Sequence, residues 1–228
     1  MAHAAAPPSA FSRASANRLT RHDLGRFEGS SLFAMLGRAV CEAGCLPRKE
    51  LFEAWEMARR VRRRFRGGRV VDLAGGHGLL AQALLLLDDS SPSAVVVDPE
   101  LPASAAKLQV SLVAVWPRLR DRIAFVAGDL EAVALDAGDL VVSCHACGGL
   151  TDSVLAVAVR AGARVAVLPC CHDLDVNDQG GLTGWVDGPL AVDVVRALRL
   201  KAQGYRIRTQ SIAREITPKN RLLIGEPV

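Results

Sequence analysis

The 228 residues include 28 basic and 24 acidic side chains, and half of all the residues are apolar. A chain of this length can bury a core of its own, so the composition predicts a globular protein. No apolar run reaches the roughly 20 residues of a membrane span, because Gln82 interrupts the longest, "LLAQALLLL". Six cysteines, four of them in two tight clusters, indicate reduced thiols in a cytoplasmic protein rather than a secreted disulfide scaffold.

The front of the chain is basic. Residues 1–69 hold 14 basic and 6 acidic side chains, a net charge of +8, whereas the remainder has a net charge of −4. We expect residues 1–29 to form a disordered leader, although their arginines and the lack of acids before Asp23 also fit an organellar transit peptide.

Residues 30–68 are predicted to form a basic helical segment, with helices over 32–43 and 48–66. Seven arginines lie between Arg59 and Arg69. This run predicts contact with RNA, and the alternative is a solvated helix end, where cations favour the helix dipole.

From residue 69 to residue 228 the chain alternates between β runs and helical patterns. Helices are predicted over 79–87, 103–116, 151–162 and 189–203. The β runs are 69–74, 93–98, 122–129, 139–144, 164–169, 205–212 and 221–226. This order predicts a doubly wound α/β domain with a seven-stranded, mostly parallel sheet and one antiparallel pairing at the edge.

The first β run of that domain ends in a loop of small residues, "DLAGGHGLL". Its spaced positions are Asp72, Ala74, Gly76 and Gly78. A strand leads into this loop and a helix follows it, so backbone N–H groups at the helix start can approach a ligand closely. A glycine loop alone is weak evidence for a nucleoside site.

Two acids at later strand ends sharpen this interpretation. Asp98 ends the second β run, where a carboxylate can accept both ribose hydroxyls, and Asp129 ends the third, where it can accept an adenine amino group. Together with the loop, residues 69–228 resemble the class I S-adenosylmethionine-dependent methyltransferases. The resemblance implies a Rossmann-like fold with S-adenosylmethionine as the cofactor.

The fourth and fifth β runs end in "SCHACGGLTD" and "PCCH", and in a class I sheet these ends are neighbours. Such ends resemble the methyltransferase domain of eukaryotic tRNA acceptor-stem 2′-O-methyltransferases. The matching positions are His145, Cys147, Gly148, Thr151, Asp152, Cys170, Cys171 and His172. On that resemblance we assign His145, Cys147, Cys170 and His172 to the catalytic side of the site.

Three chemistries remain open for these residues. His145 can act as a base on a hydroxyl, with Asp152 orienting it. Alternatively, His145 is only a packed histidine and Asp152 only caps the helix that begins there. Cys170 can act as a nucleophile toward a pyrimidine ring. Zinc can bind Cys144, Cys147, Cys170, Cys171 and His172, although these residues also suit small-residue packing, and we assign no metal.

The sequence as a whole predicts an S-adenosylmethionine-dependent methyltransferase acting on RNA, with tRNA as one candidate. The runner-up is a methyltransferase for small molecules or proteins. A different class also stays open: a non-catalytic protein of this fold that binds nucleic acid through its basic helices.

Overall fold

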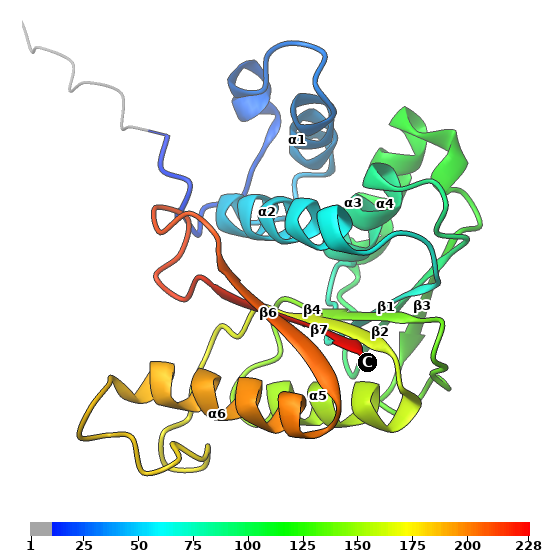
Figure 1. The fold of residues 1–228 in the computed structure, drawn as a ribbon. Coiled ribbons are helices and arrows are strands. Elements are labelled where there is room, and N and C mark those ends of the chain that lie inside the picture. Colours follow the sequence, from blue (N-terminus) through cyan, green and yellow to red (C-terminus); the bar gives the residue numbers. More distant parts are fainter. Residues whose placement is uncertain (1–10) are drawn as a thin grey trace, which may run out of the picture.

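The computed structural model describes residues 11–228 as a seven-stranded sheet with helices on both faces (Figure 1). The strand order is β3-β2-β1-β4-β5-β7-β6. The strands are β1 (Val70–Leu73), β2 (Ala94–Asp98), β3 (Ile123–Ala127), β4 (Leu140–Ser143), β5 (Arg164–Val167), β6 (Tyr205–Ser211) and β7 (Arg221–Pro227). Strands β1 to β5 pair in parallel, whereas β7 is antiparallel to both β5 and β6. The predicted doubly wound fold is confirmed, with β7 between β5 and the edge strand β6.

Helices divide between the two faces of the sheet, as Figure 1 shows. One face carries α1 (Leu32–Ala43), α2 (Arg48–Arg64), α3 (Leu79–Leu87) and α4 (Ser104–Val115), and the other carries α5 (Leu150–Ala161) and α6 (Gly188–Ala202). Two short 3-10 helices, η1 (Arg21–Arg26) and η2 (Pro117–Leu119), complete the set. Within residues 11–228, no helix has both the length and the apolar character needed to cross a bilayer.

A hydrophobic core lies on each face because successive strand side chains point to opposite sides. Val70 packs in the core under α1 to α4, and its neighbour Val71 packs in the core over α5 and α6. Leu51 and Val61 of α2 belong to the same core as Val70, so the basic helical segment and the sheet form one packed unit.

The prediction of a disordered leader is wrong for residues 11–29. Leu19 and Phe27 are buried, and the Leu19 N–H donates to the Leu46 carbonyl at 2.9 Å. These apolar side chains pack on α1 and α2, which provides the stabilisation that the local composition lacks. Residues 1–10 of the predicted leader lie outside the described part of the chain.

The arginine-rich segment is largely engaged within the protein. Its arginines pair with acids as follows: Arg59 and Arg60 with Glu56, Arg62 and Arg66 with Asp88, Arg64 with Glu226, and Arg69 with Asp139. Arg63 is exposed and makes no ion pair within residues 11–228. Arg62 and Arg64 therefore anchor α2 to the end of α3 and to β7, a function that the composition alone did not indicate.

Arg62 is the buried centre of this anchor. It pairs with Asp88 at 3.2 Å and donates to the Leu84 carbonyl at 3.1 Å and to the Ser91 hydroxyl at 2.8 Å. Burial lowers its pKa to about 10, a value at which the guanidinium is still charged near neutrality.

We expect Arg62→Ala to lower the free energy of unfolding by about 3 kcal/mol, because it removes the buried cation beside Asp88 and leaves only the exposed Arg66 at 3.7 Å. Urea unfolding measures this change. Arg63→Ala, one position along on the exposed side of α2, is the matched control and should stay within about 0.5 kcal/mol of the unmodified protein. Equal effects of the two substitutions would contradict the assigned role of Arg62.

Candidate cofactor and substrate site

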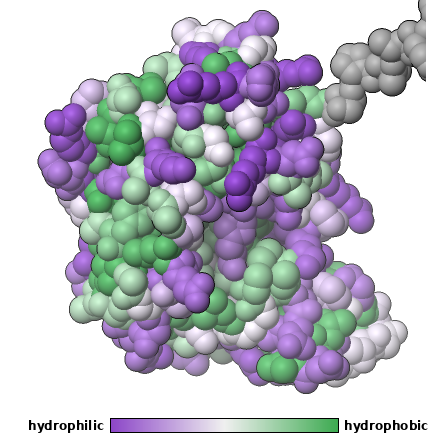
Figure 2. All heavy atoms as spheres, turned by 180° about the vertical axis from the view of Figure 1, so that it is seen from behind, coloured by the Kyte–Doolittle hydropathy of each residue, from purple (hydrophilic) through white to green (hydrophobic). Residues whose placement is uncertain are grey.

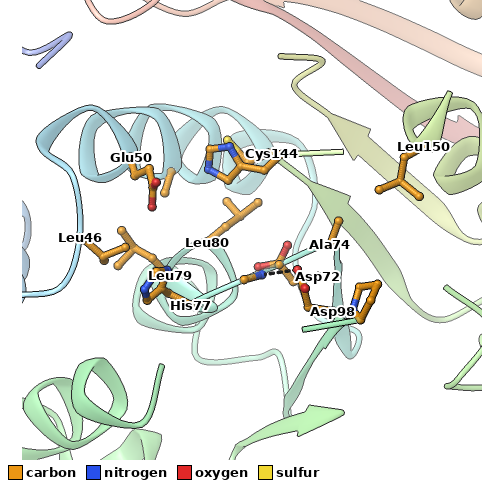
Figure 3. A pocket seen from close by; sticks show the side chains of 15 residues that line it. Leu46, Glu50, Asp72, Ala74, His77, Leu79, Leu80, Asp98, Cys144 and Leu150 are labelled. Carbon is orange, nitrogen blue, oxygen red and sulfur yellow. Dashed lines mark hydrogen bonds between the residues drawn. The ribbon is translucent and has the colours of Figure 1, made fainter. Parts of the chain in front are cut away.

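A cavity of about 370 Å³ lies at the carboxyl ends of β1, β2 and β4 (Figure 3). This volume falls in the range of small-molecule sites. The lining residues are Leu46, Glu50, Ala54, Asp72, Ala74, Gly75, Gly76, His77, Leu79, Leu80, Asp98, Pro99, Cys144, His145 and Leu150. Five residues predicted from the sequence thus line one cavity: Asp72, Ala74, Gly76, Asp98 and His145.

The glycine loop forms one wall of the cavity. Gly78 caps α3 with a φ of +70°, and a Cβ there would lie 2.8 Å from the Val96 side chain, so only glycine fits. Gly76 has a φ of +49° and open space on its Cβ side, which lets its backbone face a ligand directly. Gly78 does not line the cavity itself but starts the helix whose N-terminus points there.

Asp72 is buried at the base of the loop. One of its carboxylate oxygens, Oδ2, accepts the Ala81 N–H at 3.2 Å, and the other, Oδ1, has no hydrogen-bond partner among the described residues. Burial raises the pKa of Asp72 to about 7, and the nearby Asp98 adds to the shift. A cation bound in the cavity would satisfy both the free oxygen and the charge.

Asp98 lies at the end of β2, on the same side of the cavity as Asp72 (Figure 3). Its carboxylate accepts N–H groups from Gly76 and Glu100, both at 3.0 Å. The residue is only partly buried, and a carboxylate has about four acceptor positions, so acceptor capacity remains for ligand hydroxyls.

His77, inside the loop, is a site residue that the sequence analysis missed. Its Nε2 lies 2.7 Å from the Ser104 hydroxyl, and its ring lines the cavity. Burial lowers the pKa of His77, so the ring is mainly neutral near pH 7. The only indication in the sequence was the position of His77 between two glycines of the loop.

Helix α2 contributes acids that were also missed. Glu50 lines the cavity opposite Asp72 and Asp98, as Figure 3 shows, and Glu53 lies one helical turn further on. Burial raises the pKa of both carboxyls. Their i,i+3 spacing on one helix face was the only sequence signal, and it indicates no partner until the helix is docked on the sheet.

His145 connects this cavity to a second hollow of about 380 Å³. Ligand atoms of His145, Glu53 and Cys144 lie within 4.8 Å of one another. The pKa of His145 is lowered, first by desolvation and then by the positive charge of Lys49 and by His77. A neutral imidazole at this position can accept a proton.

The second hollow brings together residues from distant parts of the chain. It is lined by Ala16, Pro47, Lys49, Glu50, Glu53, His145, Cys170, Cys171, Thr217, Pro218 and Lys219. Glu50 and His145 belong to both hollows. Cys170 therefore lies beside His145, as the sequence analysis expected, and the Cys147 sulfur lies 3.1 Å from the Cys170 sulfur.

Besides Gly78, three predicted site residues line neither hollow: Cys147, which lies against Cys170, and Asp129 and His172, which lie elsewhere. Asp129 is exposed and accepts the Glu131 N–H at 3.0 Å, so it closes its own turn and does not line the cavity. His172 is buried against α6, where its Nε2 lies 2.8 Å from an Asp193 oxygen, and it lines neither hollow. Local partners direct both side chains away from the site, and the predicted adenine and catalytic roles have no support here.

Asp152 fulfils neither of its two expected functions. Its carboxylate accepts hydrogen bonds from the buried Arg196 guanidinium at 2.8 and 3.1 Å, and Arg196 also donates to the Gly148 carbonyl at 2.8 Å. Asp152 thus ties α5 to α6 rather than orienting His145, and the residue preceding α5 is Gly149.

A sequence model of a family described as a methyltransferase domain matches residues 50–178, more than half of the chain. The chain belongs to this family. No curated protein matches the sequence significantly. The matched region starts inside α2, which agrees with the packing of that helix into the sheet domain.

Solved methyltransferase structures resemble the fold. The apo form of the S-adenosylmethionine-dependent methyltransferase SibL has 19% identity and a TM-score of 0.52, over 90% of this chain and 65% of SibL. An O-methyltransferase family protein from Burkholderia thailandensis has 18% identity and a TM-score of 0.50, over 90% of this chain and 67% of its own. Identities this low show the fold alone, and this chain spans about two thirds of either protein.

The buried carboxyl of Asp72 makes the stability of this methyltransferase domain depend on pH. Its pKa is near 3.8 when exposed and about 7 in the folded chain, so between these values the folded state binds more protons than the unfolded state. The stability that the protonated Asp72 contributes is fully present below the lower value and is lost as pH rises through the higher one.

We expect Asp72→Asn, which carries no charge, to raise the melting temperature relative to the unmodified domain, and more at about pH 8 than at about pH 5. Thermal unfolding at both pH values measures the difference. The exposed Asp129→Asn is the control and should give the same difference at both. A Tm gain for Asp72→Asn that does not change with pH would contradict the burial of a charge.

Proposed function

We propose that this chain transfers the methyl group of S-adenosylmethionine to RNA. The observation that carries the proposal is the meeting of Asp72, Asp98 and the glycine loop with His145 in one cavity. Family membership supports methyl transfer, and the resemblance of the two cysteine-rich strand ends to tRNA methyltransferases supports an RNA acceptor.

The residues present fit the cofactor. Four acids are buried within residues 11–228, and three of them have a basic partner: Glu53 has Lys49, Asp88 has Arg62, and Asp139 has Arg69. Asp72 alone lacks one, and its Oδ1 has no partner. The cationic amino-acid and sulfonium end of S-adenosylmethionine would supply the missing positive charge, and Asp98 would hold the ribose hydroxyls.

The bound cofactor supplies an electrophilic methyl group on a positively charged sulfur. His145 would accept the proton of the acceptor hydroxyl while the oxygen forms its bond to the methyl carbon and the carbon–sulfur bond breaks. Glu53 lies within 4.8 Å of the imidazole, and its carboxylate pairs with Lys49. The loop and the α2 acids hold both reactants in place, which is the main requirement of a direct transfer.

The second hollow holds two lysines that can contact a polyanionic substrate. Lys49 and Lys219 line it beside His145, together with Glu50 and Glu53, and Lys49 pairs with Glu53. The arginine end of α2 lies about 20 Å away along the helix, since each residue rises about 1.5 Å. In the space-filling view from behind, hydrophilic residues gather around a central hollow (Figure 2). We therefore propose that RNA phosphates contact Lys49 and Lys219 first, with the Arg59–Arg69 segment as an outer contact.

Asp98→Ala should weaken S-adenosylmethionine binding at least about tenfold, because two ribose hydroxyls lose their acceptor. Isothermal titration calorimetry measures this change in affinity. Asp129→Ala is the matched control at a neighbouring strand end. An unchanged isotherm for Asp98→Ala would remove the assigned cofactor site.

Binding of S-adenosylmethionine to the unmodified chain should also strengthen as pH rises through about 7, since Asp72 then carries its charge. The same calorimetry, repeated across this pH range, measures the change.

Labelled methyl groups should enter the RNA fraction when the chain is incubated with labelled cofactor and cellular RNA, protein and metabolites. Lys49→Ala with Lys219→Ala should reduce that labelling and lower the salt slope of RNA binding by about 2. Arg63→Ala should change both less.

Label in another fraction would identify the runner-up, a small-molecule or protein methyltransferase. Cofactor binding with no label in any fraction would indicate a non-catalytic member of the fold.

A further inference from the structure

The thiols of Cys147, Cys170 and Cys171 form a cluster that the proposed methyl transfer does not require. Their sulfur atoms all lie within 4.8 Å of one another, and the shortest separation, between Cys147 and Cys170, is 3.1 Å. Zinc binds thiolate sulfur at about 2.3 Å, so two sulfurs of a tetrahedral site lie roughly 3.8 Å apart. The Cys147–Cys170 separation is shorter than that value, and the other two separations are at most 4.8 Å, so small shifts of the thiols would fit a zinc ion.

The backbone holds these three thiols together before any metal binds. Strands β4 and β5 pair in parallel, with Ser143 opposite Val167, and the Gly148 N–H donates to the Cys171 carbonyl at 3.2 Å. The buried Arg196 donates to the Gly148 carbonyl at 2.8 Å. The cluster is therefore built by ordered backbone on both strand ends, and its position does not depend on free loop motion.

The structure selects three ligands from the wider set of cysteines and histidines. Cys144 is buried and faces Glu53 and His145, outside the cluster. His172 bonds to Asp193. Cys147 is exposed and Cys170 and Cys171 are partly exposed, so an ion from solvent can reach all three.

We propose that Cys147, Cys170 and Cys171 bind one zinc ion, with the fourth coordination position open to the second hollow. Soft thiolate ligands favour zinc over magnesium or calcium, and three protein ligands with one open position are typical of zinc sites that bind a water or a substrate. Cys170 and Cys171 line the hollow that also holds His145. The Lys219 ammonium, 3.5 Å from the Cys171 sulfur, balances the net negative charge of a zinc ion with three thiolates.

Metal content and cobalt spectroscopy on the full chain test this site independently of methyl transfer. Protein prepared without added metal should contain close to one zinc per chain. After removal of zinc under reducing conditions, added Co²⁺ should give a sulfur-to-cobalt charge-transfer band and tetrahedral visible bands, and Zn²⁺ should abolish both.

Variants define the ligand set. Cys147→Ser, Cys170→Ser and Cys171→Ser should each weaken Zn²⁺ binding by more than about 100-fold, since even indirect partners of ligands contribute 10–100-fold. Cys144→Ala and Cys45→Ala are the matched controls and should keep the cobalt spectrum. Circular dichroism confirms that each variant is folded.

Three results would overturn the zinc site: no charge-transfer band, a band that survives all three serine substitutions, or binding of Cu⁺ without Zn²⁺ or Co²⁺. A Cys147–Cys170 disulfide in protein that was purified without reductant and contains no zinc would also overturn it and would assign the pair to redox chemistry. Calorimetry with S-adenosylmethionine on the same samples separates this outcome from failure of the proposed function.

Discussion

Parallel pairing of β1 with both β2 and β4 is the constraint on which the site depends. The chain leaves β1 through α3 on one face and leaves β4 through α5 on the other, so the strand order reverses between them. At such a switch the connections diverge and leave a crevice at the carboxyl ends of the strands. Asp72 reaches the crevice from β1 and His145 from the end of β4, so the residues proposed for the cofactor and for the acceptor lie side by side.

The buried acids of the sheet domain differ in whether a basic side chain neutralises them. Arg62 and Arg69 each neutralise a buried aspartate away from the cavity: Asp88 ends α3, and Asp139 precedes β4. Asp72 is equally buried but has no such partner. Proteins commonly retain an unfavourable local arrangement where a ligand completes it, and this asymmetry supports the proposed cofactor position.

Sequence patterns predicted the strands, the glycine loop and Asp98 because those features depend on a few neighbouring residues. Asp129 does not line the cavity, because a strand end defines where a side chain starts, while its own turn determines where it points. Glu50 and His77 were missed for a related reason. The sequence does not show which residues a helix face or a loop histidine will contact, because tertiary packing determines those contacts. The ordered structure of residues 11–29 likewise depends on packing against apolar surface that is distant in the sequence and forms only in the folded chain.

The run Cys170, Cys171 and His172 shows how neighbouring residues acquire separate functions. The two thiols face the hollow, while the histidine enters a buried network in which Asp193 contacts both Arg196 and Arg221. Because Arg196 also holds the Gly148 carbonyl, the same network fixes the backbone on which Cys147 is placed. A metal ligand needs this kind of support, since its affinity depends on residues that orient the ligands as well as on the ligands themselves. His172 is therefore linked to the backbone of the thiol cluster through Asp193 and Arg196, and it is not a ligand.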